Sequence, residues 1–330
     1  MQKLVEPLLS WYKKNARSLP WRENISPYKV WVSEIMLQQT RIETVKGYYA
    51  RFMEAFPTVK ALANADMEDV LKLWEGLGYY SRARHMHACA QKICAEFGGV
   101  FPESAAVLKT LPGIGDYTAG AVASLAYNRP EPAVDGNVLR VYARLNRCEA
   151  NMGDAAVKKS VREELRALYP AGECATFTSA WMELGEVICT PAAPDCAVCP
   201  LAAFCKAHAD HEETAYPRLP QKKPRRIEKR NVYLLLCGNR CAVRKRPEAG
   251  LLAGLWELPN SENEPVPDGA EACGEAVHVF SHVEWHMRGY ILRVEQELPG
   301  YTWVKREERL AKAIPSAFRH YLKILDQLGY

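Results

Sequence analysis

Two acidic residues that lie far apart in the chain are candidates for acid–base chemistry. Glu34 falls inside the apolar run from residue 27 to residue 40 and shares a helical face with Gln38. Asp135 precedes a Gly-Asn pair and an apolar stretch. A buried glutamate near another carboxylate would have a raised pKa, which suits a general acid at neutral pH. The alternatives are a solvated surface glutamate and an aspartate that only caps a helix.

Four cysteines form the strongest local signal. Cys189, Cys196, Cys199 and Cys205 are spaced C-x6-C-x2-C-x5-C, and the prolines between them favour loop. Four thiolates at this spacing suit either a tetrahedral zinc ion or an iron–sulfur cluster. Structural zinc sites with four thiolates usually come as two C-x2-C pairs, and this stretch has one. The remaining cysteines show no grouping and are predicted to be small hydrophobic residues.

Two glycines, Gly113 and Gly115, precede a predicted helix that starts at Asp116. Glycine tolerates the tight turn, and the free N–H groups of a helix start attract phosphate. An ordinary turn between two helices is the alternative. Tyr79 follows a second glycine pair and could form an aromatic tip that wedges between bases, although core packing would also explain it.

The elements that must position these residues are helical in the first two thirds of the chain. Ser26-Pro27 predicts a helix start, because serine caps and proline favours the first helical position. The arginines at 82 and 84 lie near a helix start, where a nearby phosphate would explain their placement. Glu183 is read as an ordinary helix residue. Helical periodicity predicts helices at 4–16, 27–40, 48–56, 59–62, 67–74, from 81, 105–110, from 116, 138–145, 155–168 and 175–188.

In the last third of the chain, the spacing of apolar residues changes from helical to alternating. Residues 217–230 combine three prolines with seven Lys or Arg, which predicts an extended basic linker between domains. Residues 232–244 then read as a hairpin around Gly238-Asn239, and alternation returns at 277–280 and 290–294. A helix from about residue 315 to residue 328 completes a small α+β domain.

Composition places the chain among soluble globular proteins, with 330 residues, 48% hydrophobic and 25% charged. The net charge of +4 permits a polyanionic partner without requiring one. An odd total of eleven cysteines argues against a disulfide framework. We expect neither a signal peptide nor a membrane span, and therefore a cytoplasmic, nucleoid-associated protein without a membrane partner.

Taken together, the motifs resemble the MutY family of adenine DNA glycosylases, in the helix-hairpin-helix superfamily that also holds endonuclease III. The resemblance covers essentially the whole chain. It rests on LPWR at 19–22, PYKVWVSEIMLQQT at 27–40, GLGYYSRAR at 76–84, LPGIGDYTAGA at 111–121, VDGNV at 134–138 and the cysteine spacing. The superfamily uses that spacing for a [4Fe–4S] cluster, so the resemblance favours iron–sulfur over zinc.

The resemblance implies a hydrolase of base excision repair that flips adenine, mispaired with 8-oxoguanine or guanine, out of double-stranded DNA and cuts its N-glycosidic bond. Glu34 matches the acid that protonates adenine at N7, and Asp135 matches the carboxylate that stabilises the sugar's positive charge. Tyr117 and Asn137 match residues that support this pair. The positions that match DNA or base contacts are Arg22, Gln38, Gln39, Thr40, Tyr79, Gly113, Gly115, Phe280, Ser281 and His282.

The resemblance also implies the architecture. We expect a mainly α helix-hairpin-helix glycosylase domain at 1–216 with its cluster loop at 189–205, the linker at 217–230, and an α+β Nudix-like domain at 231–330. This last domain lacks the Nudix box, so we expect it to recognise the lesion rather than hydrolyse nucleotides. Within it, Phe280-Ser281-His282 matches the loop that reads 8-oxoguanine.

One position separates this chain from its relatives. Endonuclease III-like enzymes carry a lysine where this chain has Tyr117, and that amine forms the Schiff base needed for strand cleavage. We therefore expect a monofunctional glycosylase. We also expect the protein to be a monomer. The alternatives are an endonuclease III-type pyrimidine glycosylase and lyase, and a catalytically silent iron–sulfur protein that binds DNA.

Overall fold

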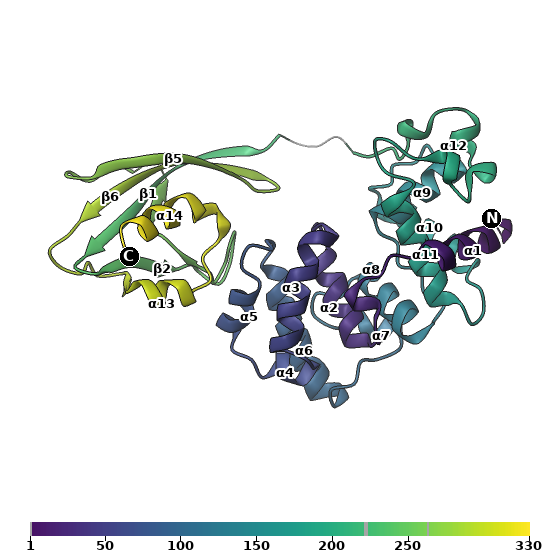
Figure 1. Ribbon diagram of the computed structural model, residues 1–330, viewed down its shortest axis with the longest axis horizontal. Helices are drawn as coiled ribbons and strands as arrows, with labels where there is room; N and C mark the ends of the chain where they lie inside the picture. Colours follow the sequence, from purple (N-terminus) through teal and green to yellow (C-terminus); the bar gives the residue numbers. More distant parts are fainter. Residues whose placement is uncertain (1, 221–223, 263) are drawn as a thin grey trace. The chain divides into compact units, whose positions relative to one another are not determined.

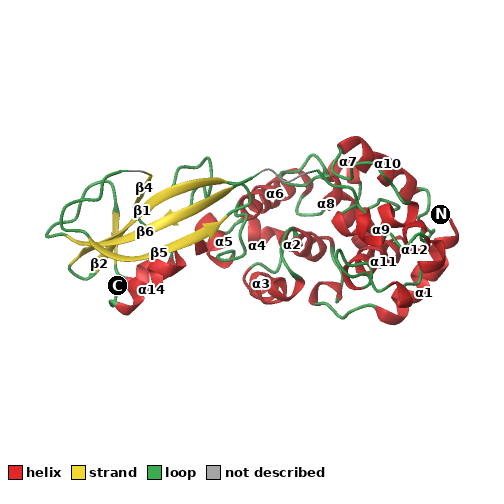
Figure 2. Cartoon of the chain, turned by 90° about the horizontal axis from the view of Figure 1, so that it is seen from above, coloured by secondary structure: helices red, strands yellow, loops and turns green. Residues whose placement is uncertain are grey.

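The chain folds into two units, which are described separately. The structure, a computed structural model, describes residues 2–220, 224–262 and 264–330. The helical unit takes Met1–Asn64 and His85–Gln221, and the sheet unit takes Ala65–Arg84 and Lys222–Tyr330. Every strand drawn in Figure 2 belongs to the sheet unit. The expected combination of a helical domain with an α+β domain is confirmed.

The helical unit is built from α-helices of 4 to 17 residues joined by turns and loops (Figure 1). A buried core joins α1, α9 and α11 through residues such as Leu8, Val141 and Trp181. Helix α6 (Ser81–Phe97) starts in the sheet unit and continues into this one. The other helices of the helical unit are α1 (Val5–Asn15), α2 (Pro27–Leu37), α3 (Ile42–Ala55), α4 (Val59–Ala63), α7 (Ala105–Leu108), α8 (Asp116–Ala121), α9 (Gly136–Asn146), α10 (Ala155–Arg166), α11 (Cys174–Val187) and α12 (Lys206–Ala209).

Local capping explains where the helices that carry the site begin. The Ser26 hydroxyl accepts a hydrogen bond from the Lys29 backbone N–H at 3.3 Å, and Pro27 opens α2 as predicted. Helix α2 ends at Leu37 rather than continuing to residue 40. Gln39 adopts a left-handed φ of 56°, which helices do not accommodate, so the predicted helix end was wrong.

The sheet unit holds one mixed sheet with the strand order β3-β2-β1-β6-β5. Strands β1 and β6 run parallel, and the other pairs are antiparallel. Along β6 the side chains of Val283, Trp285 and Met287 are buried, which is the alternation expected of a half-buried strand. The strands are β1 (Arg226–Cys237), β2 (Arg240–Lys245), β3 (Trp256–Glu257), β4 (Asn260–Glu262), β5 (Glu271–Val279), β6 (Val283–Arg293) and β7 (Thr302–Val304).

Two helices cover one face of this sheet. In Figure 1, α13 (Arg306–Ala311) and α14 (Arg319–Gln327) lie against the strands. Tyr321 of α14 shares one buried core with Leu234 of β1 and Trp285 of β6. Helix α5 (Met67–Leu73) belongs to the same unit. The predicted β1–β2 hairpin is confirmed by pairing of Leu236 with Cys241.

The predicted linker is partly strand. Strand β1 starts at Arg226, so the last five residues of the 217–230 segment pair with β6 instead of forming an extended connection. Lys222 and Lys223 lie outside the described residues. None of the helices in the described part of the chain has the length and apolar character that crossing a bilayer requires.

Candidate active site

Glu34 is a buried acid, so its interpretation as a solvated surface residue is wrong. It lies on α2, which packs against α8, and its side chain is only 5% exposed. The hydroxyl of Tyr117, at the start of α8, donates a hydrogen bond to Glu34 Oε2. Two segments 83 positions apart thus meet at one carboxyl group.

Burial raises the pKa of Glu34 to about 7. The nearby negative charge of Asp135 adds to the rise, while the hydrogen bond from Tyr117 and the positive charge of Arg22 oppose it. A carboxyl group with this pKa is present in both protonation states near neutral pH. It can therefore donate a proton and accept one back.

Asp135 caps α9 and is also part of the site. Its Oδ1 accepts a hydrogen bond from the Val138 backbone N–H at 2.8 Å, and its Oδ2 accepts one from Asn137 Nδ2 at 2.9 Å. The side chain is partly exposed, but burial still raises the pKa of Asp135, against the effect of these donors and of the Arg140 charge. The donors favour the ionised carboxylate, which can stabilise a developing positive charge.

Arg140 connects this carboxylate to the cysteine loop. Its Nη2 donates to Asn137 Oδ1 at 2.8 Å, while its Nε donates to the Cys189 backbone carbonyl at 2.8 Å. The same Nη2 also donates to the Gly185 carbonyl at 2.8 Å. A chain of hydrogen bonds therefore runs from Asp135 through Asn137 and Arg140 to Cys189.

Two helix glycines allow these elements to approach, and sequence reasoning missed both. A Cβ on Gly120 would lie 2.4 Å from the Pro132 carbonyl oxygen, in the segment that leads to Asp135. A Cβ on Gly185 would lie 2.6 Å from Asn137 Cβ. A glycine inside a helical pattern is a signal of close packing, and that signal is present at both positions.

Glu183 is a buried anchor for two arginines rather than an ordinary helix residue. Its side chain is 1% exposed and accepts hydrogen bonds from Arg17 Nε at 2.6 Å and from Arg22 Nη2 at 2.7 Å. Burial opposes ionisation, but the two arginines outweigh it and the pKa of Glu183 lies below its ordinary value. Glu183 therefore orients Arg22, whose charge acts on Glu34. No local sequence pattern links residues so far apart.

Gln39 and Tyr79, two of the positions that match DNA or base contacts, are exposed and have unusual backbones. Gln39 has φ 56° and Tyr79 has φ 48°, both in the left-handed region, and Tyr79 is 43% exposed. Non-glycine residues in this region are strained and often functional. The neighbouring Gln38 instead donates to Thr118 Oγ1 at 3.4 Å, and Thr40 donates to the Gln38 carbonyl at 3.3 Å.

Other aromatic and basic residues of the 76–84 segment are structural. Tyr80 is buried, so only Tyr79 is an exposed tip. Arg82 is buried, donates to the Leu77 and Gly78 carbonyls and stacks on Trp74. Arg84 Nη1 donates to the Ala253 carbonyl. The buried Arg82 is therefore positioned by protein groups rather than by a phosphate, whereas a phosphate contact of the partly exposed Arg84 stays a prediction.

The turn before α8 is tight. Gly113 has φ 72°, and a Cβ there would lie 2.6 Å from His85 Cβ, whereas Gly115 faces open space. Gly113 thus has to be glycine both for its backbone and for its neighbour. Gly115 is the N-cap of α8 and is exposed.

The four cysteines lie near enough to one another for their charges to interact. None of them forms a disulfide in the described chain. Burial raises the pKa of Cys199 to about 11, and the charges of Cys189 and Cys205 add to the shift. Burial likewise raises the pKa of Cys196 to about 12, with contributions from Glu213, Cys199 and Cys189. A bound metal would offset this cost by stabilising the thiolates.

Further groups surround the cysteines. Arg144 Nη1 donates to Cys189 Sγ at 3.2 Å and to the Thr190 carbonyl at 2.7 Å. Cys196, His208 and Glu213 form a group whose ligand atoms lie within 4.8 Å of one another and could hold a metal ion. Of the four predicted cysteine ligands, Cys196 belongs to this group, whose other two members lie beyond the 189–205 loop.

In the sheet unit, Phe280, Ser281 and His282 form the tight turn between β5 and β6. The Phe280 backbone N–H donates to the Val283 carbonyl at 2.8 Å. These residues line a pocket of about 570 Å³, together with Tyr79, Leu251 and His278. A pocket of this size accommodates a small ligand or a base.

Comparisons with known proteins agree with both units. Residues 32–170 match the HhH-GPD superfamily of base excision DNA repair proteins, and residues 231–324 match the NUDIX domain family. Adenine DNA glycosylase from Rattus norvegicus is 33% identical over 97% of this chain and 77% of its own length. The enzyme from Homo sapiens is 33% identical over 96% of this chain and 73% of its own length.

Solved structures show the same helical fold. A thermostable thymine-DNA glycosylase aligns with a TM-score of 0.57 and 26% identity, covering 63% of this chain and 97% of its own. A trapped endonuclease III–DNA covalent intermediate aligns with a TM-score of 0.55 over 64% of this chain and 96% of its own. At 22% identity, the second similarity concerns the fold alone.

Proposed function

Because this chain belongs to the adenine DNA glycosylase family of base excision repair enzymes, with its HhH-GPD and NUDIX domains, we propose that it excises adenine mispaired with 8-oxoguanine or guanine. The observation that carries the proposal is the buried Glu34 carboxyl group with its pKa of about 7, held by Tyr117. Adenine leaves poorly as an anion, so its departure needs a proton donor of this kind.

In the proposed reaction, Glu34 donates its proton to adenine N7 while the bond between C1′ and N9 breaks. The bonding electrons stay with N9, and the sugar acquires positive charge at C1′. The Asp135 carboxylate, oriented by Asn137 and the Val138 N–H, stabilises that charge. Water then attacks C1′ and gives its proton to the Glu34 carboxylate, which restores the acid. Arg22, held by Glu183, would contact the edge of the flipped base.

We propose that the enzyme is monofunctional. Strand cleavage through a Schiff base needs an amine that attacks C1′. At the position where endonuclease III-like enzymes carry that amine, this chain has Tyr117, whose hydroxyl binds Glu34 and whose pKa is raised by burial. A protonated phenol cannot form the Schiff base, and water remains as the nucleophile.

Lesion recognition is assigned to the turn at 280–282. The Ser281 hydroxyl and the His282 imidazole can hydrogen-bond the N7–H and O8 groups that distinguish 8-oxoguanine from guanine. Both line the pocket of the sheet unit. Gln39 and Tyr79 are exposed and strained, which suits a role in filling or wedging the base stack. Gly113 and Gly115 would bind the DNA phosphate through backbone N–H groups.

We propose that Cys189, Cys196, Cys199 and Cys205 hold a [4Fe–4S] cluster. Their spacing and the mutual effect of their charges support this assignment. A cluster bound there would tie residues 189–205 into one rigid loop that Arg140 and Arg144 contact. Native protein should carry iron and inorganic sulfide and absorb visible light, whereas a colourless protein loaded with zinc would contradict the cluster.

The decisive experiment uses one duplex that carries adenine opposite 8-oxoguanine, assayed with and without alkali. Strand breaks that appear after alkali alone are expected, because base removal leaves an abasic site. Breaks without alkali would indicate a lyase of the endonuclease III type. Intact adenine would indicate a protein that binds DNA without catalysis.

Lesion recognition has its own test. The double change Ser281→Ala and His282→Ala should reduce the preference for 8-oxoguanine over guanine opposite adenine, while adenine excision itself continues. An unchanged preference would remove the 280–282 turn from recognition.

A further inference from the structure

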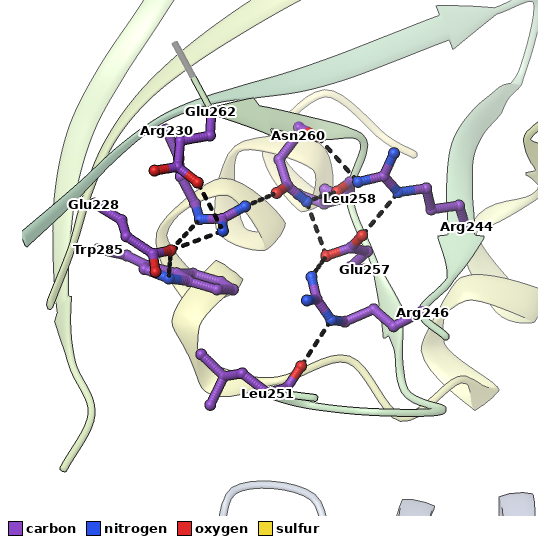
Figure 3. A network of polar contacts seen from close by, with 10 residues as sticks. All are labelled: Glu228, Arg230, Arg244, Arg246, Leu251, Glu257, Leu258, Asn260, Glu262 and Trp285. Atoms are coloured by element: carbon purple, nitrogen blue, oxygen red, sulfur yellow. Dashed lines mark hydrogen bonds and ion pairs between the residues drawn. The ribbon is translucent and has the colours of Figure 1, made fainter. Parts of the chain in front are cut away.

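A buried ionic network in the sheet unit extends to Leu251, which lines the pocket (Figure 3). Glu257 is 1% exposed and accepts hydrogen bonds from Arg244 Nε at 2.7 Å, from Asn260 Nδ2 at 2.9 Å and from Arg246 Nη1. Glu228, also buried, binds Arg230 at 2.8 Å. The function proposed above uses none of these groups.

Arg246 extends from this network to one wall of the pocket. Its Nε donates to the Leu251 backbone carbonyl at 3.0 Å (Figure 3). Leu251 and Leu252 line the pocket, and they belong to a turn with positive φ at Gly250 (90°), Leu252 (56°) and Gly254 (64°). A turn with a leucine in the left-handed region needs support from its surroundings to persist.

The same guanidinium also faces Trp285, which contacts the 280–282 turn. The centre of the Arg246 guanidinium lies 5.8 Å from the centroid of the Trp285 ring. Trp285 is fully buried, and its ring meets Phe280 edge to face with centroids 4.9 Å apart. Phe280 lines the pocket beside Ser281 and His282. Trp285 is itself fixed, because its Nε1 donates to Glu228 Oε2 at 2.9 Å.

We infer that Arg246 is a positioning residue for lesion specificity, which sets the 250–252 turn against the 280–282 turn across the pocket. The inference rests on the proposed function, since it assigns specificity to that pocket. Arginine suits the role because its planar group donates in several fixed directions at once. A lysine would keep the charge beside Glu257 but cannot hold that carboxylate and the Leu251 carbonyl in the same geometry.

Arg244 provides a matched control. It binds the same carboxylate, and its Nη2 donates to the Asn260 carbonyl at 3.0 Å, away from the pocket-lining residues. Arg244→Lys and Arg246→Lys therefore make the same chemical change on the same partner. The two arginines differ in two contacts, because Arg246 binds the Leu251 carbonyl and faces the Trp285 ring.

The experiment measures single-turnover adenine excision by the full-length enzyme on duplexes with 8-oxoguanine or guanine opposite adenine, over a range of enzyme concentrations. Arg246→Lys should lower the preference for 8-oxoguanine about tenfold, the scale on which a displaced binding group acts at a distance. The loss should appear as a higher enzyme concentration for half-maximal excision on the 8-oxoguanine duplex. The maximal rate should be retained. Arg244→Lys should leave the preference unchanged.

The outcomes separate the possible errors. Equal preferences for the two lysine variants would overturn the inference, even if both lose thermal stability. If Arg246→Lys does not fold, Arg246→Gln repeats the test with a smaller donor. In the background of Ser281→Ala and His282→Ala, Arg246→Lys should cause no further loss of preference. If that double change itself has no effect, the proposed function of the pocket fails, and the role of Arg246 fails with it. If the double change lowers the preference and Arg246→Lys does not, the role of Arg246 alone fails.

Discussion

The Tyr117 hydroxyl donates a hydrogen bond to the Glu34 carboxyl group, and this bond joins the start of α8 to α2. This contact lowers the pKa of Glu34, whereas burial raises it, and burial prevails. We therefore expect Tyr117 to adjust the pH range in which Glu34 would act as an acid.

Tyr117→Phe should shift the pH profile of adenine excision to higher pH. Phenylalanine removes the donor that favours ionised Glu34, so the pKa of Glu34 should rise above about 7 and the acid should stay protonated in more alkaline solution. Single-turnover rates across pH give the measurement. Tyr127→Phe is the control, because that hydroxyl donates to the Phe101 carbonyl. An alkaline limb that stays in place, or moves to lower pH, would contradict this role.

Glu34→Gln should reduce adenine excision by roughly a hundredfold to ten-thousandfold, the range that a general acid contributes. Glutamine keeps the shape of the side chain but cannot give up a proton. Binding of the mispaired duplex should persist, as measured by fluorescence anisotropy. Excision near the wild-type rate would show that another group is the acid.

The same change should stabilise the protein in a pH-dependent way. The folded-state pKa of Glu34, about 7, exceeds the value of 4.5 for an exposed glutamate, so folding favours the neutral form. The favourable contribution is complete below pH 4.5 and is lost as pH rises through 7. Above about pH 7, Glu34→Gln should therefore raise the free energy of unfolding by at most about 3 kcal/mol. Thermal unfolding at acid and alkaline pH compares the two proteins, and an equal difference at both would refute the argument.

Glu183→Gln should lower the rate of adenine excision about tenfold or more, through loss of Arg22 orientation. It should also reduce the free energy of unfolding by about 2 kcal/mol, because two partly exposed arginines lose a buried partner. Excision assays and denaturant unfolding measure the two effects. Glu173→Gln is the control, since Glu173 forms an exposed pair with Lys13. Similar excision by both variants would exclude Glu183 from positioning.

Arg140→Lys should impair both the active site and the cysteine loop. Lysine cannot bind Asn137 Oδ1, the Gly185 carbonyl and the Cys189 carbonyl together, as Arg140 does. We expect slower excision together with a lower content of bound metal, read from metal analysis of the purified protein. Arg147→Lys, at an exposed site that pairs with Asp210 and Glu212, should leave both unchanged. Loss of excision with full metal content would contradict the proposed link between the active site and the cysteine loop.

Sequence reasoning located the elements whose signals are local. Ser26-Pro27 marks the start of α2, and Gly238-Asn239 marks the β1–β2 hairpin, because capping and turn chemistry depend on neighbouring residues. The pair Glu34 and Asp135 was also identified, and the structure brings their charges within reach of each other.

Other features depended on contacts that no local pattern records. In the sequence, Glu183 resembles any other helix glutamate. In the structure, it binds Arg17 and Arg22, which lie more than 160 positions away in the chain. Arg82 looked like a phosphate ligand, but its partners are the carbonyls of the preceding turn and the Trp74 ring. The early end of α2 followed from the backbone of Gln39, which periodicity alone does not reveal.

Three nearby residues of α11 contact the candidate site. Glu183 accepts hydrogen bonds from Arg17 and Arg22, and the Gly185 carbonyl accepts one from Arg140. The Glu186 carboxylate accepts one from Asn137 at 3.3 Å. Arg17 and Arg22 both lie in the short segment between α1 and α2. A local opening of that segment would release Arg22 while the core of the helical unit stays folded. Catalytic competence would then be lost at a lower free energy than global unfolding, and amide hydrogen exchange at residues 16–22 would report it.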